Sequence, residues 1–124
     1  MKNRKFKTAL FNIGKQPVSG NYYPKDAVEK AIAKFNSKER FVTTEMEVTP
    51  RLEHAIGTVK LALEDETVMA DMEIFRTKQT EDMWELIRTD CARFKPMGFG
   101  TTVNGVVQDD YEIRHIALVG NFDE

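Results

Sequence analysis

The sequence has few of the residues that most often carry chemistry or cross-link a small fold. Among its 124 residues there are one cysteine, one tryptophan and two histidines. A lone Cys91 cannot form an internal disulfide, and two histidines without cysteines or carboxylates at ligand spacing do not describe a metal site. Because the chain also has no Walker lysine and no G-x-G-x-x-G motif, we expect it to bind no metal and no cofactor.

Long apolar runs and a strong excess of one charge are also missing. No stretch approaches the roughly 20 apolar residues that cross a bilayer, and no apolar stretch of signal-peptide length follows the charged N-terminus. The 18 basic and 20 acidic residues are spread along the chain and give a net charge of −2. We therefore expect no membrane association, no nucleic acid as the main partner, and a location in a reducing cytoplasm.

The composition that remains is that of a folded globular protein, with 41% hydrophobic and 31% charged residues. A chain of this length can bury a sufficient core without staples. We therefore expect a single domain over residues 1–124.

Periodicity predicts two helices and several short strands. Apolar residues at helical spacing predict one helix after Pro24 and a second that Thr80 caps and that ends near Phe94. Strands are predicted over residues 6–13, 41–48, 56–63, 68–75, 97–107 and 111–119. Because the helices are not interleaved as βαβ units, the order favours an α+β fold with a mostly antiparallel curled sheet or small β-barrel flanked by two helices.

Three short motifs follow one another in an informative order: LEHAIGTV at 52–59, KPMGFG at 95–100 and IRHIALV at 113–119. Together they resemble the capsid-maturation (prohead) proteases of tailed phages, whose fold is shared with the herpesvirus assemblins. The NYYP segment at 21–24 is also similar to those enzymes and extends the resemblance over roughly residues 17 to 120. The resemblance implies a mostly antiparallel β-barrel flanked by helices.

The resemblance also implies a catalytic triad, and one member of it is missing. His54 stands at the position of the general base and His115 at that of the third member, but Pro96 occupies the position of the nucleophilic serine. Proline has no hydroxyl, so acyl transfer cannot run through this residue. Thr101 is the fallback nucleophile, although five strand residues at about 3.4 Å each place it roughly 17 Å from position 96.

The same residues also have simpler interpretations. His54 reads as a surface histidine in a loop, and His115 as a half-buried, hydrogen-bonded strand histidine. The glycines of the GFG segment at 98–100 are more typical of a bend or bulge than of a phosphate-binding loop. Whether the two histidines lie near each other cannot be read from their spacing.

We therefore expect a phage head protein with an inactive prohead-protease-like fold, a pseudoenzyme kept for protein–protein interaction. It would bind the major capsid protein or another head protein as a decoration (cement) or accessory assembly protein, with homo-oligomerisation as a further option. It would occupy the host cytoplasm during assembly and then the virion head. Apolar strand edges and the segments 1–11 and 121–124 are the expected docking elements.

Two alternatives stay open. One is a shortened, active maturation protease of the serine/threonine type that uses Thr101 with His54 and His115. The other is a small phage-encoded inhibitor of a host factor.

Overall fold

Two sheets and two helices account for most of the residues that the computed structural model describes, namely 3–17, 19–44 and 52–120. In chain order the elements are β1 (Arg4–Asn12), β2 (Gly14–Lys15), β3 (Tyr22–Tyr23), α1 (Lys25–Asn36), β4 (Phe41–Thr43), the 3₁₀ turn η1 (Leu52–His54), β5 (Ala55–Glu64), β6 (Thr67–Ile74), α2 (Lys78–Arg88), β7 (Ala92–Phe99), β8 (Thr102–Val103), β9 (Val106–Val107) and β10 (Glu112–Gly120).

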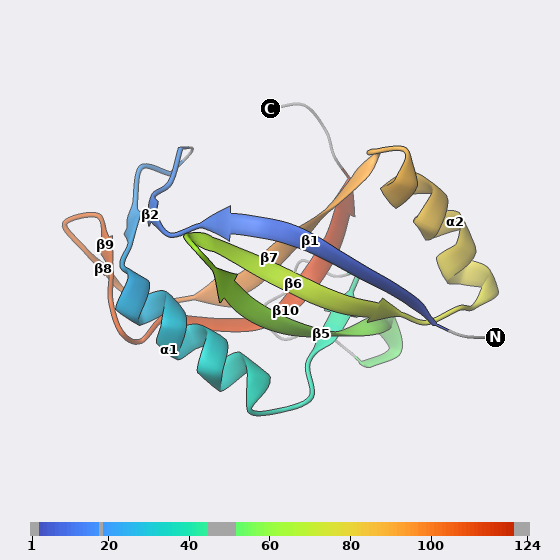
Figure 1. Ribbon diagram of the computed structural model, residues 1–124, viewed down its shortest axis with the longest axis horizontal. Coiled ribbons are helices and arrows are strands. Elements are labelled where there is room, and N and C mark those ends of the chain that lie inside the picture. The colour runs from blue at the N-terminus through green and yellow to red at the C-terminus, as the bar shows by residue number, and fades with distance from the viewer. Residues whose placement is uncertain (1–2, 18, 45–51, 121–124) are drawn as a thin grey trace.

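The main sheet has six strands in the order β1-β6-β5-β4-β10-β7 and curls into a half-barrel (Figure 1). Its neighbouring strands are antiparallel except for β4 and β10, which are parallel. A second, small sheet has the order β2-β3-β9-β8. The expected α+β fold, a curled and mostly antiparallel sheet flanked by two helices, is confirmed.

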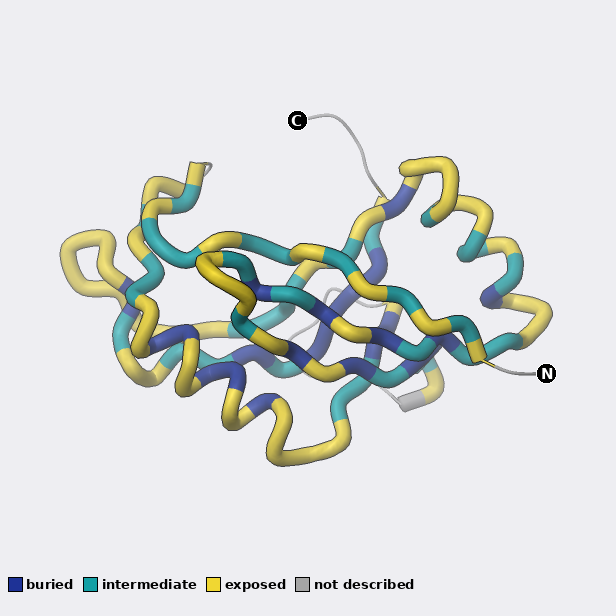
Figure 2. The backbone as a smooth tube through the Cα atoms, viewed as in Figure 1, coloured by how far each residue is buried: buried dark blue, intermediate teal, exposed yellow. Residues whose placement is uncertain are grey.

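Helix α1 covers the concave face of the main sheet (Figure 1). Pro24 supplies an extended N-cap with φ of −63°, which suits the ring-fixed backbone of proline at a helix start. The apolar stripe predicted from the sequence is the buried face of this helix: Ala27, Val28, Ala31, Ile32 and Phe35. All but Ala27 share one core with inward-facing residues of β5, β6 and β10. Figure 2 shows buried positions along β6 alternating with intermediate or exposed ones.

Helix α2 begins with a reciprocal cap that is shifted from the prediction. Thr77 is the N-cap, and its side-chain oxygen accepts a hydrogen bond from the Thr80 N–H at 3.2 Å, while the Thr80 hydroxyl accepts one from the Thr77 N–H at 2.8 Å. The Thr80 hydroxyl also donates to the carbonyl of Phe75. Thr80 is therefore the N3 residue of a capping box, the third residue of the helix. The prediction that Thr80 is itself the cap was wrong by three residues.

Helix α2 also ends earlier than predicted. It stops at Arg88, and Asp90 adopts a positive φ of 63°, a conformation that ends helices. The chain reverses there, and Ala92 opens β7. The predicted continuation of the helix to Phe94 was therefore wrong, because the apolar residue at that position belongs to a strand.

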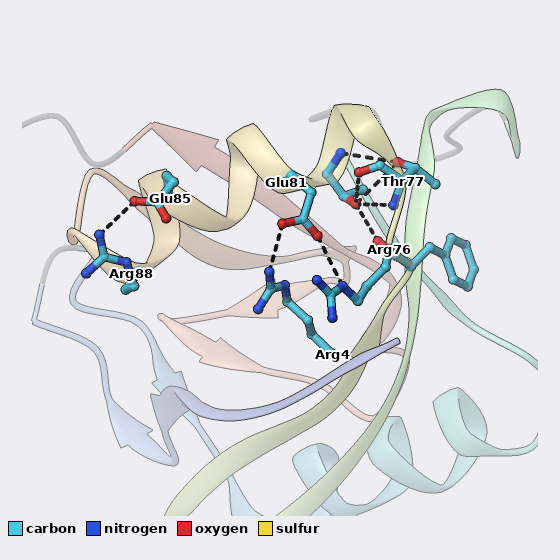
Figure 3. A network of polar contacts seen from close by, with 8 residues as sticks. Arg4, Arg76, Thr77, Glu81, Glu85 and Arg88 are labelled. Carbon is cyan, nitrogen blue, oxygen red and sulfur yellow. Dashed lines mark hydrogen bonds and ion pairs between the residues drawn. The ribbon is translucent and has the colours of Figure 1, made fainter. Parts of the chain in front are cut away.

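An ion-pair network holds α2 against β1. The Glu81 carboxylate lies between two guanidinium groups, 2.8 Å from Arg4 on β1 and 3.2 Å from Arg76, which precedes the helix (Figure 3). Arg4 also lies over the ring of Trp84 at 4.8 Å, and Trp84 packs edge-on against Phe6 of β1. Charge and aromatic contacts thus fix the same helix to the same strand.

The predicted strand over 97–107 is two separate structures. Strand β7 covers Ala92–Phe99, and residues 102–107 form the hairpin of β8 and β9. Asn104 and Gly105 turn this hairpin with positive φ angles of 52° and 77°, as a two-residue turn of the mirror-image type requires. The Asn-Gly pair was the sequence signal for this turn, and it was missed.

The predicted strand over 41–48 is described only in part. Strand β4 covers Phe41–Thr43, and residues 45–51 lie outside the described residues. A regularly alternating strand would bury Val42 together with Thr44, but Val42 and Thr43 are both buried and Thr44 is exposed. The alternation fails because the β4–β5 ladder has a register shift between Val42 and Thr43.

Candidate functional site

His115 lies in the interior of the main sheet. Its side chain is 1% exposed, and its Nδ1 is 3.0 Å from the hydroxyl oxygen of Thr43, which is equally buried. Every residue from 115 to 118 is buried, so β10 is covered on both faces at this point. The histidine is hydrogen-bonded within a strand, as the simpler interpretation predicted, but it is fully rather than half buried.

His54 ends the turn η1 immediately before β5. Its carbonyl accepts a hydrogen bond from the backbone N–H of Thr44 at 3.3 Å, its Nε2 lies 4.0 Å from the Glu53 carboxylate, and a third of its side chain is exposed. Thr43 pairs in register with Ala55, the residue after His54. Thr43 therefore lies between the strands of the two histidines. Its hydroxyl contacts the His115 ring on β10, and its backbone is in register with Ala55 of β5, the residue after His54.

Pro96 lies on β7, next to the strand of His115 but on the other face of the sheet. In the β7–β10 ladder His115 is opposite Met97, and Pro96 is opposite Ile116. Directly opposed residues share a face and successive residues alternate, so the Pro96 ring is on the concave side with Ile116, away from the His115 ring. Strand β7 is an edge of the sheet, where a proline without an N–H is tolerated.

Thr101 is remote from His115 and has a partner of its own. It comes four residues after Met97, the residue opposite His115, which corresponds to about 14 Å along the strand direction. Its hydroxyl donates to the Asp110 carboxylate at 2.5 Å, and its N–H donates to the same group at 2.9 Å. These two bonds lower the pKa of Asp110, so the carboxylate is a weak base.

A groove opens at the gap between the two edge strands of the half-barrel. Edge strand β1 and the loop after it contribute its first wall, from Ala9 to Asn12 and on through Gln16, and β7 contributes its second wall, from Arg93 to Gly98. Two adjoining hollows of ≈ 650 and ≈ 220 Å³ make up this β1–β7 groove. The larger hollow has a volume within the range of small-molecule sites.

Aromatic rings line the β1–β7 groove on the concave side. The ring centroids of Phe11 and Tyr23 are 5.6 Å apart and those of Tyr23 and Tyr111 are 5.3 Å apart, both pairs edge to face. Burial, followed by the neighbouring Tyr23, raises the pKa of the Tyr111 hydroxyl well above its usual range. No other described residue forms a hydrogen bond with this hydroxyl, which therefore stays a protonated donor.

The charged side chains that line the β1–β7 groove are all basic. They are Lys15, Arg93 and Lys95, and no acidic side chain lines either hollow among the residues described. None of the three has an ion-pair partner within the described part of the chain. The groove is thus a positive site on a chain whose net charge is −2.

This basic site could not be seen in the sequence, where the basic residues look evenly spread. Lys15 lies nearly 80 positions before Arg93 and Lys95, and only the curling of β1 toward β7 brings the three to one groove. Tyr111 did carry a signal, because it is an aromatic residue at the start of the final predicted strand. It was read only as the strand boundary.

Residues 3–17, 19–44 and 52–120 contain neither a helix suited to spanning a bilayer nor a cluster suited to holding a metal ion. None of the helices is long and apolar enough to span a bilayer. No group of three or more His, Cys, Asp or Glu side chains in these ranges is arranged to hold a metal ion. Comparisons of the chain with protein-family models, curated proteins and solved structures found no match.

Proposed function

We propose that this chain is a phage head protein that binds its partner without catalysing a reaction. It acts as a decoration or accessory assembly protein on the major capsid protein or another head protein. The proposal rests on the motif resemblance, and one observation carries its non-catalytic part. Position 96, where the resemblance requires a nucleophile, holds a proline whose ring is on the face of the sheet opposite His115.

Proteolysis needs a nucleophile within hydrogen-bond reach of its base. The expected base, His54, precedes β5, which β4 and β10 separate from the Pro96 strand β7. His115 is engaged by Thr43 inside the sheet, and Thr101 donates its hydroxyl to Asp110 in an exposed turn. A carboxylate of lowered pKa does not take the proton of a threonine hydroxyl at neutral pH. These contacts favour a binding role over an acyl-transfer role.

A binding role also has surfaces to act through. Besides the β1–β7 groove, the small second sheet exposes an apolar group on one face: Tyr22, Val103 and Val106 are 50%, 53% and 36% exposed. Val106 pairs in register with both of the others, so all three side chains share that face. Exposed apolar groups of this kind are typical of interaction sites.

The test is immunodetection of the chain in purified mature particles, with the capsid subunit as the reference for stoichiometry. The proposal expects the chain at a fixed ratio to the capsid subunit after washing in high salt. Its absence from particles, when lysate from the same infection contains it, contradicts the proposal and favours the host-factor alternative.

A second experiment addresses the protease alternative. The purified chain is incubated with the capsid precursor, and the products are separated by electrophoresis. The proposal expects no fragments. Fragments that disappear with His54→Ala and with Thr101→Val would contradict it and establish the shortened protease instead.

A further inference from the structure

The β1–β7 groove lies between two strand edges that have no hydrogen-bonded neighbour in the main sheet. Each edge carries features that discourage simple strand addition. A register shift between Ala9 and Phe11 leaves Leu10 as a bulge in β1, and Pro96 removes a backbone donor from β7. An occupant of the groove is therefore held mainly by side-chain contacts rather than by a ladder of backbone hydrogen bonds.

Those side chains define what fits. Lys15, Arg93 and Lys95 line the groove, and none is neutralised by a carboxylate in the described ranges. On β7, Arg93 and Lys95 are opposite Val119 and Ala117, so they flank the groove from the face of the strand opposite Pro96, while the aromatic rings line it from the concave side. Unpaired cations around a partly apolar groove attract carboxylates, which they bind through charge-assisted hydrogen bonds. The hydroxyl of Tyr111 adds a neutral donor that stays protonated at physiological pH.

We infer that the β1–β7 groove binds a short, extended, acidic peptide segment of a partner protein, with one aromatic or aliphatic side chain against Phe11, Tyr23 and Tyr111 and with carboxylates facing Lys15, Arg93 and Lys95. This inference rests on the proposed function, because it names the surface through which such a binding protein would hold its partner.

A single-stranded nucleic acid is the competing polyanion, and the groove suits it less. The three aromatic rings pack edge to face against one another and are partly buried, so they do not offer successive open faces for base stacking. The chain as a whole is negatively charged, which disfavours a partner with one charge per nucleotide. A peptide with a few carboxylates matches three cations more closely.

Fluorescence anisotropy with synthetic peptides tests the inference on the full chain. The probe is a labelled, end-blocked peptide of sequence Glu-Asp-Phe-Asp-Glu, and its matched control is Gln-Asn-Phe-Asn-Gln, which has the same shape without charge. We expect the acidic peptide to bind at least about tenfold more tightly than the neutral one at low salt, and the difference to shrink as salt screens the charges. Equal binding of the two peptides would overturn the inference.

Variants locate the binding. The double variant Arg93→Gln with Lys95→Gln should weaken binding of the acidic peptide about tenfold, whereas Lys78→Gln on α2 removes a remote cation and should leave it unchanged. Tyr111→Phe keeps the ring and should weaken binding roughly threefold. Far-ultraviolet circular dichroism and thermal melting verify that each variant is folded. If Lys78→Gln weakens binding as much as the double variant, the charge effect is not local and the inference fails.

Three further outcomes test this inference, and the last two separate it from the proposed function. If an oligothymidylate of five nucleotides binds more tightly than the acidic peptide at the same salt, the groove is a nucleic-acid site and the inference is overturned. If the wild-type chain is found in particles and the double variant is found there at the same ratio, the proposed function stands and the groove assignment falls. If the peptide binds as expected while the chain is absent from particles, the groove assignment stands and the proposed function falls.

Discussion

Thr43 contacts His115 inside the sheet. The two side chains are both buried, and the 3.0 Å contact between the Thr43 hydroxyl and the His115 ring links β4 to β10. Burying an imidazole costs free energy because it is removed from water, and a hydrogen bond offsets this cost. If the hydrogen-bond partner is removed, the cost remains and the fold is destabilised. The pair therefore has a structural role that accounts for a buried histidine without catalysis.

Replacing Thr43 tests this role. Thr43→Val keeps the volume but removes the hydroxyl, and we expect it to lower the free energy of unfolding by about 1–3 kcal/mol. Thr43→Ser keeps the hydroxyl and should cost less. Urea denaturation followed by circular dichroism measures both. A Thr43→Val variant as stable as the wild type would show that the hydrogen bond contributes nothing.

Pro96 allows a direct test of the missing nucleophile. Pro96→Ser restores the hydroxyl that the family resemblance requires, yet the new side chain would point to the concave face, away from His115. We expect the variant to release no fragments from the capsid precursor, as assayed by electrophoresis, and to remain folded. Cleavage by Pro96→Ser that His54→Ala abolishes would mean that the register of β7 and β10 differs from the one described.

Gly98 is required by a close approach of two backbones. A Cβ atom at this position would lie 2.2 Å from the carbonyl oxygen of Glu112 on β10, next to the register shift between Ile113 and His115. The sequence predicted a bend or bulge at the glycines of 98–100, and the bulge is present on the partner strand instead.

Alanine at Gly98 should therefore disrupt this ladder. We expect Gly98→Ala to lower the free energy of unfolding by about 2 kcal/mol or more, within the range for overpacked sites, as measured by urea denaturation. Lys95→Ala, at an exposed position of the same strand, is the control and should change it by less than about 0.5 kcal/mol. Equal stabilities for the two variants would contradict the close approach.

Among the elements, α2 has an attachment that depends on pH. The hydrogen bond from Arg4, with a further one from Arg76, lowers the pKa of Glu81 despite the desolvation that opposes it. A lowered pKa in the folded state means that the contact stabilises above the usual pKa of a glutamate and is lost as pH falls through the lowered value. The attachment of α2 to β1 should weaken in acid and not in base.

Trp84 reports this attachment, since it is the only tryptophan and its ring packs on Phe6 of β1. We expect its emission to shift to longer wavelength as pH is lowered from 5 toward 2. Glu81→Gln should show a shifted emission already at pH 7, with little further change in acid. Glu85→Gln removes an ion pair to Arg88 within the helix and should behave like the wild type. An acid shift that survives in Glu81→Gln would assign it to other groups.

Elements were predictable where one local signal decided them. The stripe from Ala27 to Phe35 identified α1 because helical spacing and burial coincide there. The boundary between α2 and β7 could not be predicted in this way. Asp90 ends the helix by adopting a left-handed backbone conformation, and the spacing of apolar and polar residues does not indicate that conformation. The hairpin at Asn104 and Gly105 was predictable in principle, but the alternating pattern around it outweighed the turn signal.

At the scale of the whole molecule, the fold class with its curled sheet was predictable, but the order of the strands was not. Short strands with two separate helices indicate an α+β fold, but strand order depends on pairings far apart in sequence: β1 with β6, and β4 parallel to β10. No local pattern encodes those partners, because each depends on which faces are covered in the finished fold. The positions of His54, Pro96 and His115 relative to one another were unreadable for the same reason.

The half-barrel brings its two edge strands together through aromatic side chains. Phe6 of β1 lies 5.6 Å from Phe94 of β7 and 5.6 Å from Trp84 of α2, measured between ring centroids. Within the described residues β1 and β7 share no ladder of hydrogen bonds, so these rings are the main contact between the first and last strands of the sheet order.

Removing the ring of Phe6 should therefore act on the whole molecule rather than on one strand. We expect Phe6→Ala to lower the free energy of unfolding by about 2–3 kcal/mol, and to speed hydrogen exchange in both β1 and β7, as measured by mass spectrometry. Phe99→Ala is the matched control, because this ring is 46% exposed and should cost less than about 1 kcal/mol. If exchange increases in β1 alone, the two edges are held independently and the aromatic contact does not join them.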